Sequence, residues 1–239
     1  MKGLIVAIQF LTRLPMPQVE ASPQDLARSM RWFPVVGLLL GALVAGATWA
    51  GSQIDSWTGA LCGLVFWVVL TGGLHLDGLA DVADAAGAAH KGPGRIRAVL
   101  SDPHVGSFGV VAIGLQLLTK LVLLHALANG GEWRSILLIP FAARIAPLGW
   151  SLALPPLHTG LGSLFGDGTS LRLVVAWMIV LGAAALVAPA LLAAPVLAGL
   201  WALWLRRRLG GLSGDGHGAG IEIVESGLLL AALLSRAAP

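Results

Sequence analysis

Three aspartates lie in an otherwise apolar and glycine-rich segment, GGLHLDGLADVADAAG, at residues 72–87. On an α-helix Asp77, Asp81 and Asp84 fall at positions i, i+4 and i+7, so their side chains point from one narrow face. Each carboxylate would cost roughly 2.5–3.5 kcal/mol at the centre of a bilayer, and the three would repel one another. A solvated acidic loop would have polar flanks, which this segment lacks. The segment therefore predicts a helix whose carboxylates share a cation.

The composition of the chain indicates an integral membrane protein. Of the 239 residues 56% are hydrophobic and only 11% are charged, and the mean hydropathy is +0.84; in globular domains roughly a quarter of residues are charged. The net charge of +3 does not indicate a nucleic-acid partner, because the basic residues are scattered at segment ends. The expected surroundings are membrane lipid. The single Cys62 is interpreted as a small core residue, and no disulfide is expected.

The apolar residues are grouped in long segments separated by charged residues, Gly, Pro and Trp. Seven such segments are predicted, at about 33–51, 58–76, 106–128, 134–154, 172–188, 191–205 and 221–235. The fifth and sixth, divided only at Pro189 and Pro195, are expected to form a tight hairpin. The N-terminal segment is too short to span, and its breaks at Arg13 and Pro15 favour an interfacial or re-entrant helix. We therefore predict one all-α domain over residues 1–239, a polytopic bundle of about 6–7 transmembrane helices.

The basic residues predict the orientation of this bundle. They precede the first span (Arg13, Arg28, Arg31), separate the second from the third (Lys91, Arg95, Arg97) and follow the sixth (Arg206, Arg207, Arg208). The intervening loops at 52–57, 129–134 and 189–195 are nearly free of them, so the N-terminus is expected in the cytoplasm. Counting crossings then places residues 77–105, 155–171 and 206–220 on the cytoplasmic side of the inner membrane.

A second polar cluster, LGGLSGDGHGAGIEIVES, lies near the C-terminal end. Its glycine-rich start leads into a predicted helix carrying Glu222 and Glu225 at i and i+3. By the crossing count Asp215 and His217 face the same side as the three aspartates. Carboxylates without cysteine ligands suit a hard cation such as Mg²⁺. The predicted Mg²⁺ ligands are Asp77, Asp81, Asp84 and Asp215.

The run KGPGRIRAVLSDPHVGSFGV connects the first acidic segment to the third span. Its groups suited to an anionic substrate are three cations and three small residues with accessible N–H groups, namely Lys91, Arg95 and Arg97, and Gly106, Ser107 and Gly109. Each cation could equally serve only to orient the protein in the membrane. Asp102 and His104 lie beside the same span entrance and are predicted to join the site. Arg144, inside the fourth span, is either functional or a buried partner of a glutamate.

Four runs of residues occur in order along nearly the whole chain: FLTRLP, GGLHLDGLAD with a further Asp84, DPHVGSFG, and GLSGDGHGA before a Glu-bearing helix. They resemble the membrane-bound cobalamin synthases, also called adenosylcobinamide-GDP ribazoletransferases. The resemblance implies that a ribose hydroxyl of α-ribazole, or of its 5′-phosphate, attacks adenosylcobinamide-GDP and releases GMP with assistance from Mg²⁺. It leaves open whether the protein forms homo-oligomers or contacts other enzymes of cobalamin synthesis.

The candidate site residues fall into two sets. The catalytic candidates are His75, Asp77, Asp81 and Asp84, with either His75 or an aspartate as the general base. His75 lies off the three-Asp face, so it could instead be a hydrogen-bond partner at the helix entry. The candidates for binding substrate or phosphate are Lys91, Arg95, Asp102, His104, Gly106, Ser107, Ser213, His217, Glu222 and Glu225.

The chain departs from the family pattern at three positions. Val82 and Ser213 each stand where Thr is expected, and both changes are mild. His104 stands where Arg is expected, which removes a permanently charged bidentate phosphate donor.

Two other classes of protein use membrane carboxylates. A CDP-alcohol phosphotransferase would carry an Asp-Gly-x-x-Ala-Arg pattern, but here Asp77-Gly78 is followed by Leu-Ala-Asp. A cation-coupled transporter would place carboxylates near the bilayer midplane, within inverted repeats. The crossing count places them at one rim, which favours the transferase.

Overall fold

Each apolar segment of the sequence forms one or more helices in the computed structural model, which describes residues 2–88, 93–157 and 161–237. These ranges contain no strand, apart from an isolated bridge between Pro156 and Leu212, so the predicted all-α class is confirmed. The α-helices are α1 (Lys2–Leu11), α2 (Pro23–Ser29), α3 (Phe33–Gly51), α4 (Ser56–Thr71), α5 (Leu74–Ala88), α6 (Pro93–Leu100), α7 (Ser107–Asn129), α8 (Trp133–Ala143), α9 (Ala146–Ala153), α10 (Leu161–Leu164), α11 (Leu171–Ala185), α12 (Ala194–Arg208) and α13 (Gly214–Ala237). Short 3₁₀-helices are η1 (Met30–Trp32), η3 (Phe165–Gly168) and η4 (Pro189–Ala193).

The number of membrane-crossing helices is close to the prediction. Five stretches of the described chain are long and apolar enough to span, namely Pro23–Gly51, Ser107–Asn129, Trp133–Ala153, Pro189–Arg208 and Gly214–Arg236. A sixth is formed if α4 and α5 are taken as one span with a bend of 84°. The N-terminal α1 and the 15-residue α11 are apolar but shorter. The chain is thus a multi-pass membrane protein.

The bend between α4 and α5 corrects the predicted second span at 58–76. Helix α4 ends at Thr71, because Gly72 and Gly73 take φ values of +62° and +72°, a left-handed conformation open chiefly to glycine. A side chain at Gly72 would also clash with Arg13, because a Cβ added at Gly72 would lie 2.8 Å from Arg13 Cγ. The turn places His75 on α5 together with the three aspartates.

Two further boundaries differ from the prediction. The span expected at 134–154 is divided into α8 and α9 at Arg144 and Ile145. The last span begins at Gly214, so Asp215 and His217 lie in the first turns of α13 and not in a loop. Helix formation starts this early because Ser213 caps it: its Oγ accepts a hydrogen bond of 3.0 Å from the amide of Gly216.

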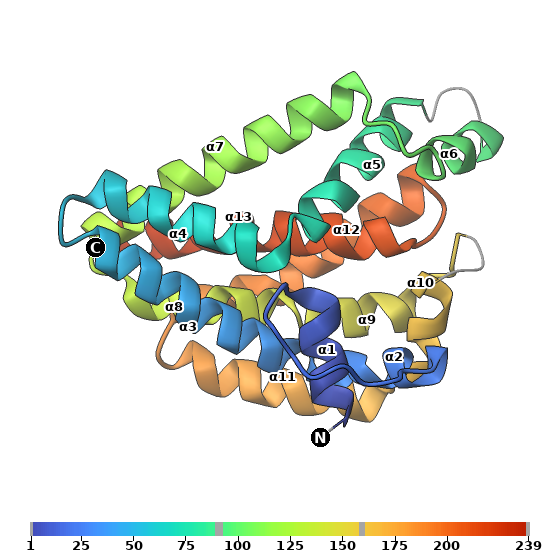
Figure 1. Cartoon of the computed structure of the whole chain (residues 1–239), viewed down its shortest axis with the longest axis horizontal. Helices are drawn as coiled ribbons and strands as arrows, with labels where there is room; N and C mark the ends of the chain where they lie inside the picture. The colour runs from blue at the N-terminus through green and yellow to red at the C-terminus, as the bar shows by residue number, and fades with distance from the viewer. Residues whose placement is uncertain (1, 89–92, 158–160, 238–239) are drawn as a thin grey trace.

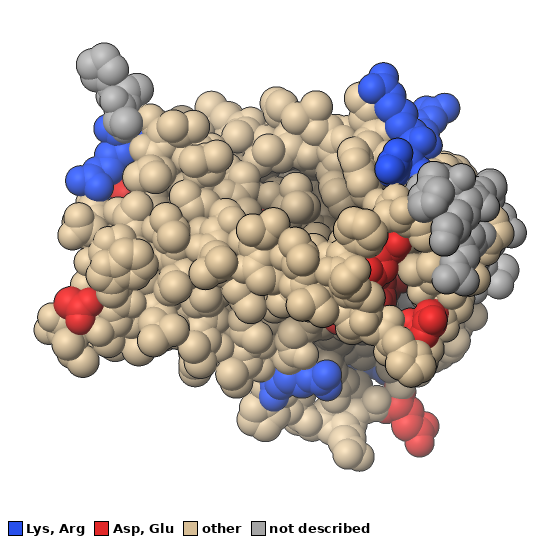
Figure 2. All heavy atoms as spheres, turned by 90° about the horizontal axis from the view of Figure 1, so that it is seen from above, with Lys and Arg blue, Asp and Glu red and all other residues tan. Residues whose placement is uncertain are grey.

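The long helices run roughly along the longest axis of the molecule (Figure 1). Helices α5, α6 and α10 and the α12–α13 turn lie at one end, and the α3–α4 turn lies at the other. Two contacts join segments of the first end. Leu157 N–H donates to the carbonyl of Leu212 between two loops (2.9 Å), and Arg208 Nη2 of α12 donates to the carbonyl of Ala86 on α5 (3.4 Å). Figure 2 shows a broad belt almost without charged side chains between the ends. This arrangement agrees with a bilayer around the middle of the bundle.

Helix α3 packs closely on α8 through glycines. A Cβ on Gly37 would lie 2.8 Å from Cα of Phe141, and one on Gly41 would lie 2.8 Å from the carbonyl carbon of Leu137. Both obstacles are backbone atoms, which cannot rotate away. Close approach of the two backbones therefore depends on these glycines.

We expect Gly41→Ala to lower the free energy of unfolding by about 1–3 kcal/mol, because the added methyl group must push α3 away from α8. Thermal unfolding in detergent would measure the change. Gly46→Ala is the matched control on the same helix, since no atom lies within 4 Å of its Cβ position. Equal melting temperatures for the two variants would contradict the packing role of Gly41.

Candidate functional site

The two polar clusters of the sequence meet where α5 crosses the start of α13. Gly78 of α5 lies against the backbone of Asp215, with 2.9 Å between its Cβ position and the Asp215 carbonyl oxygen. Gly218 of α13 packs on His75, with 3.3 Å between its Cβ position and the His75 Cα. The absence of side chains at these two glycines lets the helices approach closely. The crossing brings the first turns of α13 beside the carboxylates of α5.

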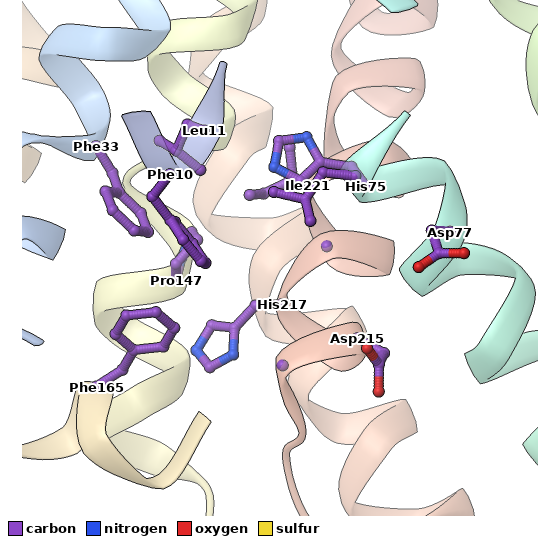
Figure 3. A pocket seen from close by; sticks show the side chains of 13 residues that line it. Phe10, Leu11, Phe33, His75, Asp77, Pro147, Phe165, Asp215, His217 and Ile221 are labelled. Carbon is purple, nitrogen blue, oxygen red and sulfur yellow. The ribbon is translucent and has the colours of Figure 1, made fainter. Parts of the chain in front are cut away.

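Asp77, Asp81 and Asp215 form the acidic part of the site. Asp77 is exposed and the other two are half-buried. Asp81 experiences the charges of Asp215, Asp77 and Asp84. Figure 3 shows the carboxylates of Asp77 and Asp215 on neighbouring helices at one side of a pocket. Within the described residues no three His, Cys, Asp or Glu side chains are grouped so that they could hold a metal ion by themselves. The donors have the right chemistry for a hard cation, and Mg²⁺ commonly completes its shell with water and substrate phosphate.

Asp84 is placed differently from the other aspartates. Its Oδ2 accepts a hydrogen bond from the amide of Gly106 (2.7 Å), and its Oδ1 accepts one from the amide of Gly109 (3.1 Å). Two of the three N–H groups predicted to bind substrate are therefore satisfied by a carboxylate of the chain itself, at the positive end of α7. Asp84 thus joins α5 to α7, in a capping role that the sequence did not reveal.

The predicted anion-binding run lies around this junction. Lys91 lies outside the described residues, and Arg95 lies on α6. Asp102 and His104 are both exposed and contact each other, with 2.7 Å between Asp102 Oδ1 and His104 Nδ1 and 3.0 Å between the same oxygen and the His104 amide nitrogen. Ser107 is exposed in the first turn of α7. Asp102, His104 and Ser107 do not line the pocket of Figure 3.

A pocket of about 150 Å³, partly open to the outside, lies beside the acidic residues. Its two sides differ in chemistry (Figure 3). On one side α5 and α13 present polar side chains, and on the other side α1, α3, α9 and η3 present apolar ones. The principal lining residues are His75, Asp77 and Asp215 on the polar side, Phe10, Leu11, Phe33, Pro147 and Phe165 on the apolar side, and His217 of α13, whose ring lies against Phe165.

His217 is buried and both of its ring nitrogens are occupied. Nδ1 lies 3.0 Å from the carbonyl oxygen of Ser213, and Nε2 lies 2.9 Å from Oγ of Ser151. A carbonyl only accepts, so Nδ1 carries a proton, and in the neutral ring Nε2 accepts from the Ser151 hydroxyl. His217 therefore presents its ring to the pocket. Ser213, predicted with it as a substrate contact, is buried and serves as the cap of α13.

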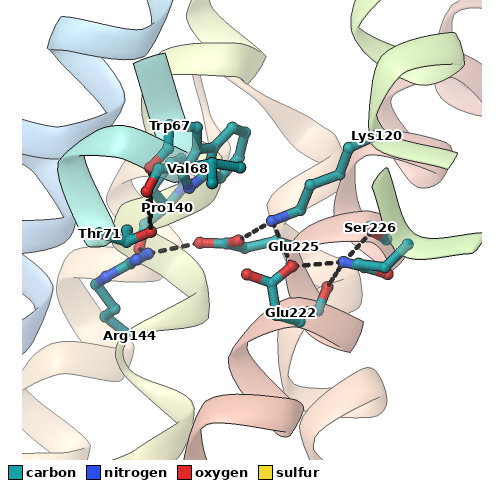
Figure 4. Close-up of polar contacts among 10 residues, drawn as sticks. Trp67, Val68, Thr71, Lys120, Pro140, Arg144, Glu222, Glu225 and Ser226 are labelled. Carbon is teal, nitrogen blue, oxygen red and sulfur yellow. Dashed lines mark hydrogen bonds and ion pairs between the residues drawn. The ribbon is translucent and has the colours of Figure 1, made fainter. Parts of the chain in front are cut away.

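Glu222 and Glu225 lie further along α13, in a buried network of charges (Figure 4). Lys120 of α7 pairs with both, at 2.7 Å from Glu222 and 2.6 Å from Glu225. Arg144 pairs with Glu225 at 2.6 Å, which is the glutamate partnership that the sequence left as one alternative. Gln116 donates to Glu222 at 2.7 Å. The two carboxylates are thus neutralised within the protein, and the structure places them away from the pocket lining.

Sequence reasoning missed two parts of this arrangement. Lys120 carried a signal, because an ionisable residue inside an apolar span needs a buried partner. The aromatic wall carried none: Phe10, Phe33 and Phe165 come from three apolar segments, and only the tertiary fold brings their rings within 5.9 Å of one another.

The chain matches the family model described as cobalamin-5-phosphate synthase over residues 3–233. It belongs to this family. It is 56% identical to the adenosylcobinamide-GDP ribazoletransferase of Novosphingobium aromaticivorans, with 98% of this chain and 97% of the relative covered. It is also 49% identical to the proteins of that name from Thiobacillus denitrificans (99% and 97% covered) and Laribacter hongkongensis (100% and 99% covered). No solved structure matches.

The match confirms the family predicted from the sequence motifs, and with it the prediction of an enzyme of cobalamin biosynthesis. Two of those motifs are brought together in space. GGLHLDGLAD supplies the bend, the crossing glycine Gly78 and the carboxylates of α5, and GLSGDGHGA supplies the cap and first turns of α13. In this cobalamin-5-phosphate synthase the two motifs therefore build one site.

Removal of Lys120 should destabilise the fold strongly. Lys120→Met leaves two buried carboxylates with one cation, and we expect a loss of about 3–5 kcal/mol, measured by thermal unfolding in detergent. Lys120→Met combined with Glu222→Gln should recover part of the loss, because one stranded charge is removed. Lys2→Met, which breaks the exposed pair with Asp25, is the control and should change little. Wild-type stability of Lys120→Met would contradict the role of the network.

Proposed function

We propose that the protein is an adenosylcobinamide-GDP ribazoletransferase that works at the crossing of α5 and α13. A ribose oxygen of α-ribazole, or of its 5′-phosphate, forms a bond to the phosphorus that carries the cobinamide group. The bond from that phosphorus to the oxygen of GMP breaks, and GMP leaves with the bonding electrons. The observation that carries the proposal is that Asp77 and Asp215 line one pocket, with Asp81 near enough to experience their charges, in a chain of this family.

The acidic residues support a role for Mg²⁺ in this reaction. Asp77, Asp81 and Asp215 would hold the ion, with Asp84 behind them at the α7 junction. When bound, Mg²⁺ would neutralise phosphate charge and stabilise the leaving GMP. Without a cation these carboxylates would repel both one another and the diphosphate, so the same residues that bind the metal would otherwise exclude the substrate.

Two side chains could accept the proton of the attacking hydroxyl. His75 lines the pocket, and its buried Nδ1 has no partner among the described residues. Asp77 lines the same pocket and is exposed. His217 is a poorer candidate, because its nitrogens already bond to Ser213 and Ser151. We therefore propose His75 or Asp77 as the base.

The diphosphate of adenosylcobinamide-GDP needs cations as well as a metal. Lys91, Arg95 and His104 belong to the run between α5 and α7 and are proposed to contact it. Asp102 would orient His104 through their mutual contact. Homo-oligomers and contacts with other enzymes of the pathway stay predictions.

The membrane is proposed to be the inner membrane, with the site facing the cytoplasm. The clustering of Arg206, Arg207 and Arg208 at the end of α12 supports this orientation, since positive residues favour the cytoplasmic side. The polar loops of the site lie at that same end (Figure 1).

Asp81→Asn and Asp215→Asn should each lower the rate of GMP release by about 100-fold or more, because an amide is a poor ligand for a hard cation. The assay uses purified protein in vesicles with adenosylcobinamide-GDP, α-ribazole and Mg²⁺. EDTA should abolish turnover, and added Mg²⁺ should restore it. Asp167→Asn is the control, since this exposed aspartate of η3 lies outside the pocket lining. Normal turnover in the Asp81→Asn and Asp215→Asn double variant would refute the metal site.

Single cysteines test the orientation. In a background lacking Cys62, Ala98→Cys on α6 and Arg207→Cys on α12 should resist an impermeant thiol reagent in intact cells and react in inverted vesicles. Ile54→Cys, in the highly exposed turn at the opposite end, should show the reverse pattern. Labelling of Ala98→Cys and Arg207→Cys from opposite sides would rule out a shared cytoplasmic site.

A further inference from the structure

The apolar side of the pocket is built from aromatic rings of three separate segments. Phe10 of α1, Phe33 of α3 and Phe165 of η3 pack against one another, with ring centroids 5.8–5.9 Å apart. Phe165 also meets the His217 ring at 5.5 Å in an edge-to-face arrangement. The rings form one continuous surface that adjoins the empty space (Figure 3).

The polar groups of the pocket are confined to the facing side. Among the described lining residues the ionisable side chains are His75, Asp77, Asp215 and His217, all on α5 or α13. Both ring nitrogens of His217 are hydrogen-bonded, to Ser213 and Ser151, so His217 contributes only its aromatic ring to the pocket surface. The pocket thus suits a ligand with an apolar aromatic part and a hydroxylated part, oriented with the hydroxyls toward the carboxylates.

The polarity and size of each substrate of the proposed reaction decide which one fits this pocket. Guanine carries hydrogen-bonding atoms around most of its edge, and these would lose their partners against Phe10, Phe33 and Phe165. The corrin of cobinamide, with its many amides, is far too large for a pocket of about 150 Å³. The base of α-ribazole is a dimethylbenzimidazole, an apolar bicycle with a single free acceptor nitrogen. Its low polarity matches that of the aromatic side.

We infer that the pocket walled by Phe10, Phe33, Phe165 and His217 binds the benzimidazole base of the acceptor nucleoside, with the ribose toward Asp77 and Asp215. This inference rests on the proposed function. The base stacks against the aromatic side, and His75, whose Nδ1 has no partner among the described residues, lies on the polar side near the sugar. The adenosylcobinamide-GDP then occupies the open mouth beyond the carboxylates. The pocket thus selects the acceptor nucleoside, and the carboxylates at its open mouth position the reacting phosphate.

Steady-state kinetics with each substrate varied in turn tests the assignment. Phe10→Leu and Phe165→Leu should raise the KM for α-ribazole by about 5- to 10-fold, because ring contacts with the base are lost. The KM for adenosylcobinamide-GDP should stay within about twofold of wild type. Phe10 is only half-buried, so its variant keeps the test available if Phe165→Leu fails to fold. Phe66→Leu on the outer surface of α4 is the control.

Equilibrium dialysis with α-ribazole alone separates this inference from the proposed function. Wild type should bind α-ribazole, and the two variants should bind it about 5- to 10-fold more weakly, without any turnover. A rise in the KM for adenosylcobinamide-GDP alone, or no change in either KM, would overturn the inference while leaving the function in place. Absence of GMP release by wild type would refute the function, and α-ribazole binding would still decide whether the pocket takes the base.

Discussion

The buried pairing of Lys120 and Arg144 with Glu222 and Glu225 is the interaction on which the arrangement of this bundle depends. Two positive and two negative side chains, all almost completely shielded, balance one another inside an apolar protein. Uncompensated charges at this depth would be costly, so α7, α8 and α13 must meet in one register. Helix α13 cannot slide or rotate without stranding a charge.

The rigid attachment of α13 has consequences two turns away, at its N-terminal end. The turns before Glu222 carry Asp215 and His217, so the network that fixes the glutamates also fixes the position of the site. Asp84 provides a second attachment, because its carboxylate caps α7 and thereby ties α5 to the same helix that carries Lys120. Asp77 and Asp81 project between these two anchors. The charged site at the end of the bundle is thus positioned by charge pairing in the interior of the bundle.

The sequence predicted the fold class, the family and the meeting of the two polar clusters, because each depends on residue types at short spacing. The i, i+4, i+7 spacing of Asp77, Asp81 and Asp84 placed all three correctly on one helix, but it could not show that Asp84 turns to the amides of Gly106 and Gly109. Such long-range hydrogen bonds depend on tertiary distance. The substrate roles and the Mg²⁺ site remain predictions for a different reason, because they involve groups that do not belong to the chain.

The glycine-rich start of α13 shows how tertiary contact overrides local preference. Each glycine inside a helix costs about 1 kcal/mol relative to alanine, so this segment reads as a loop by propensity. In the structure Gly218 lies against the backbone of His75, and a Cβ on Gly220 would lie 2.6 Å from Cδ1 of Trp201. Trp201 Nε1 in turn donates to the carbonyl of Gly216 at 3.0 Å. The glycines therefore allow α13 to pack closely against α5 and α12. These tertiary contacts stabilise the helix and offset the low helix propensity of glycine.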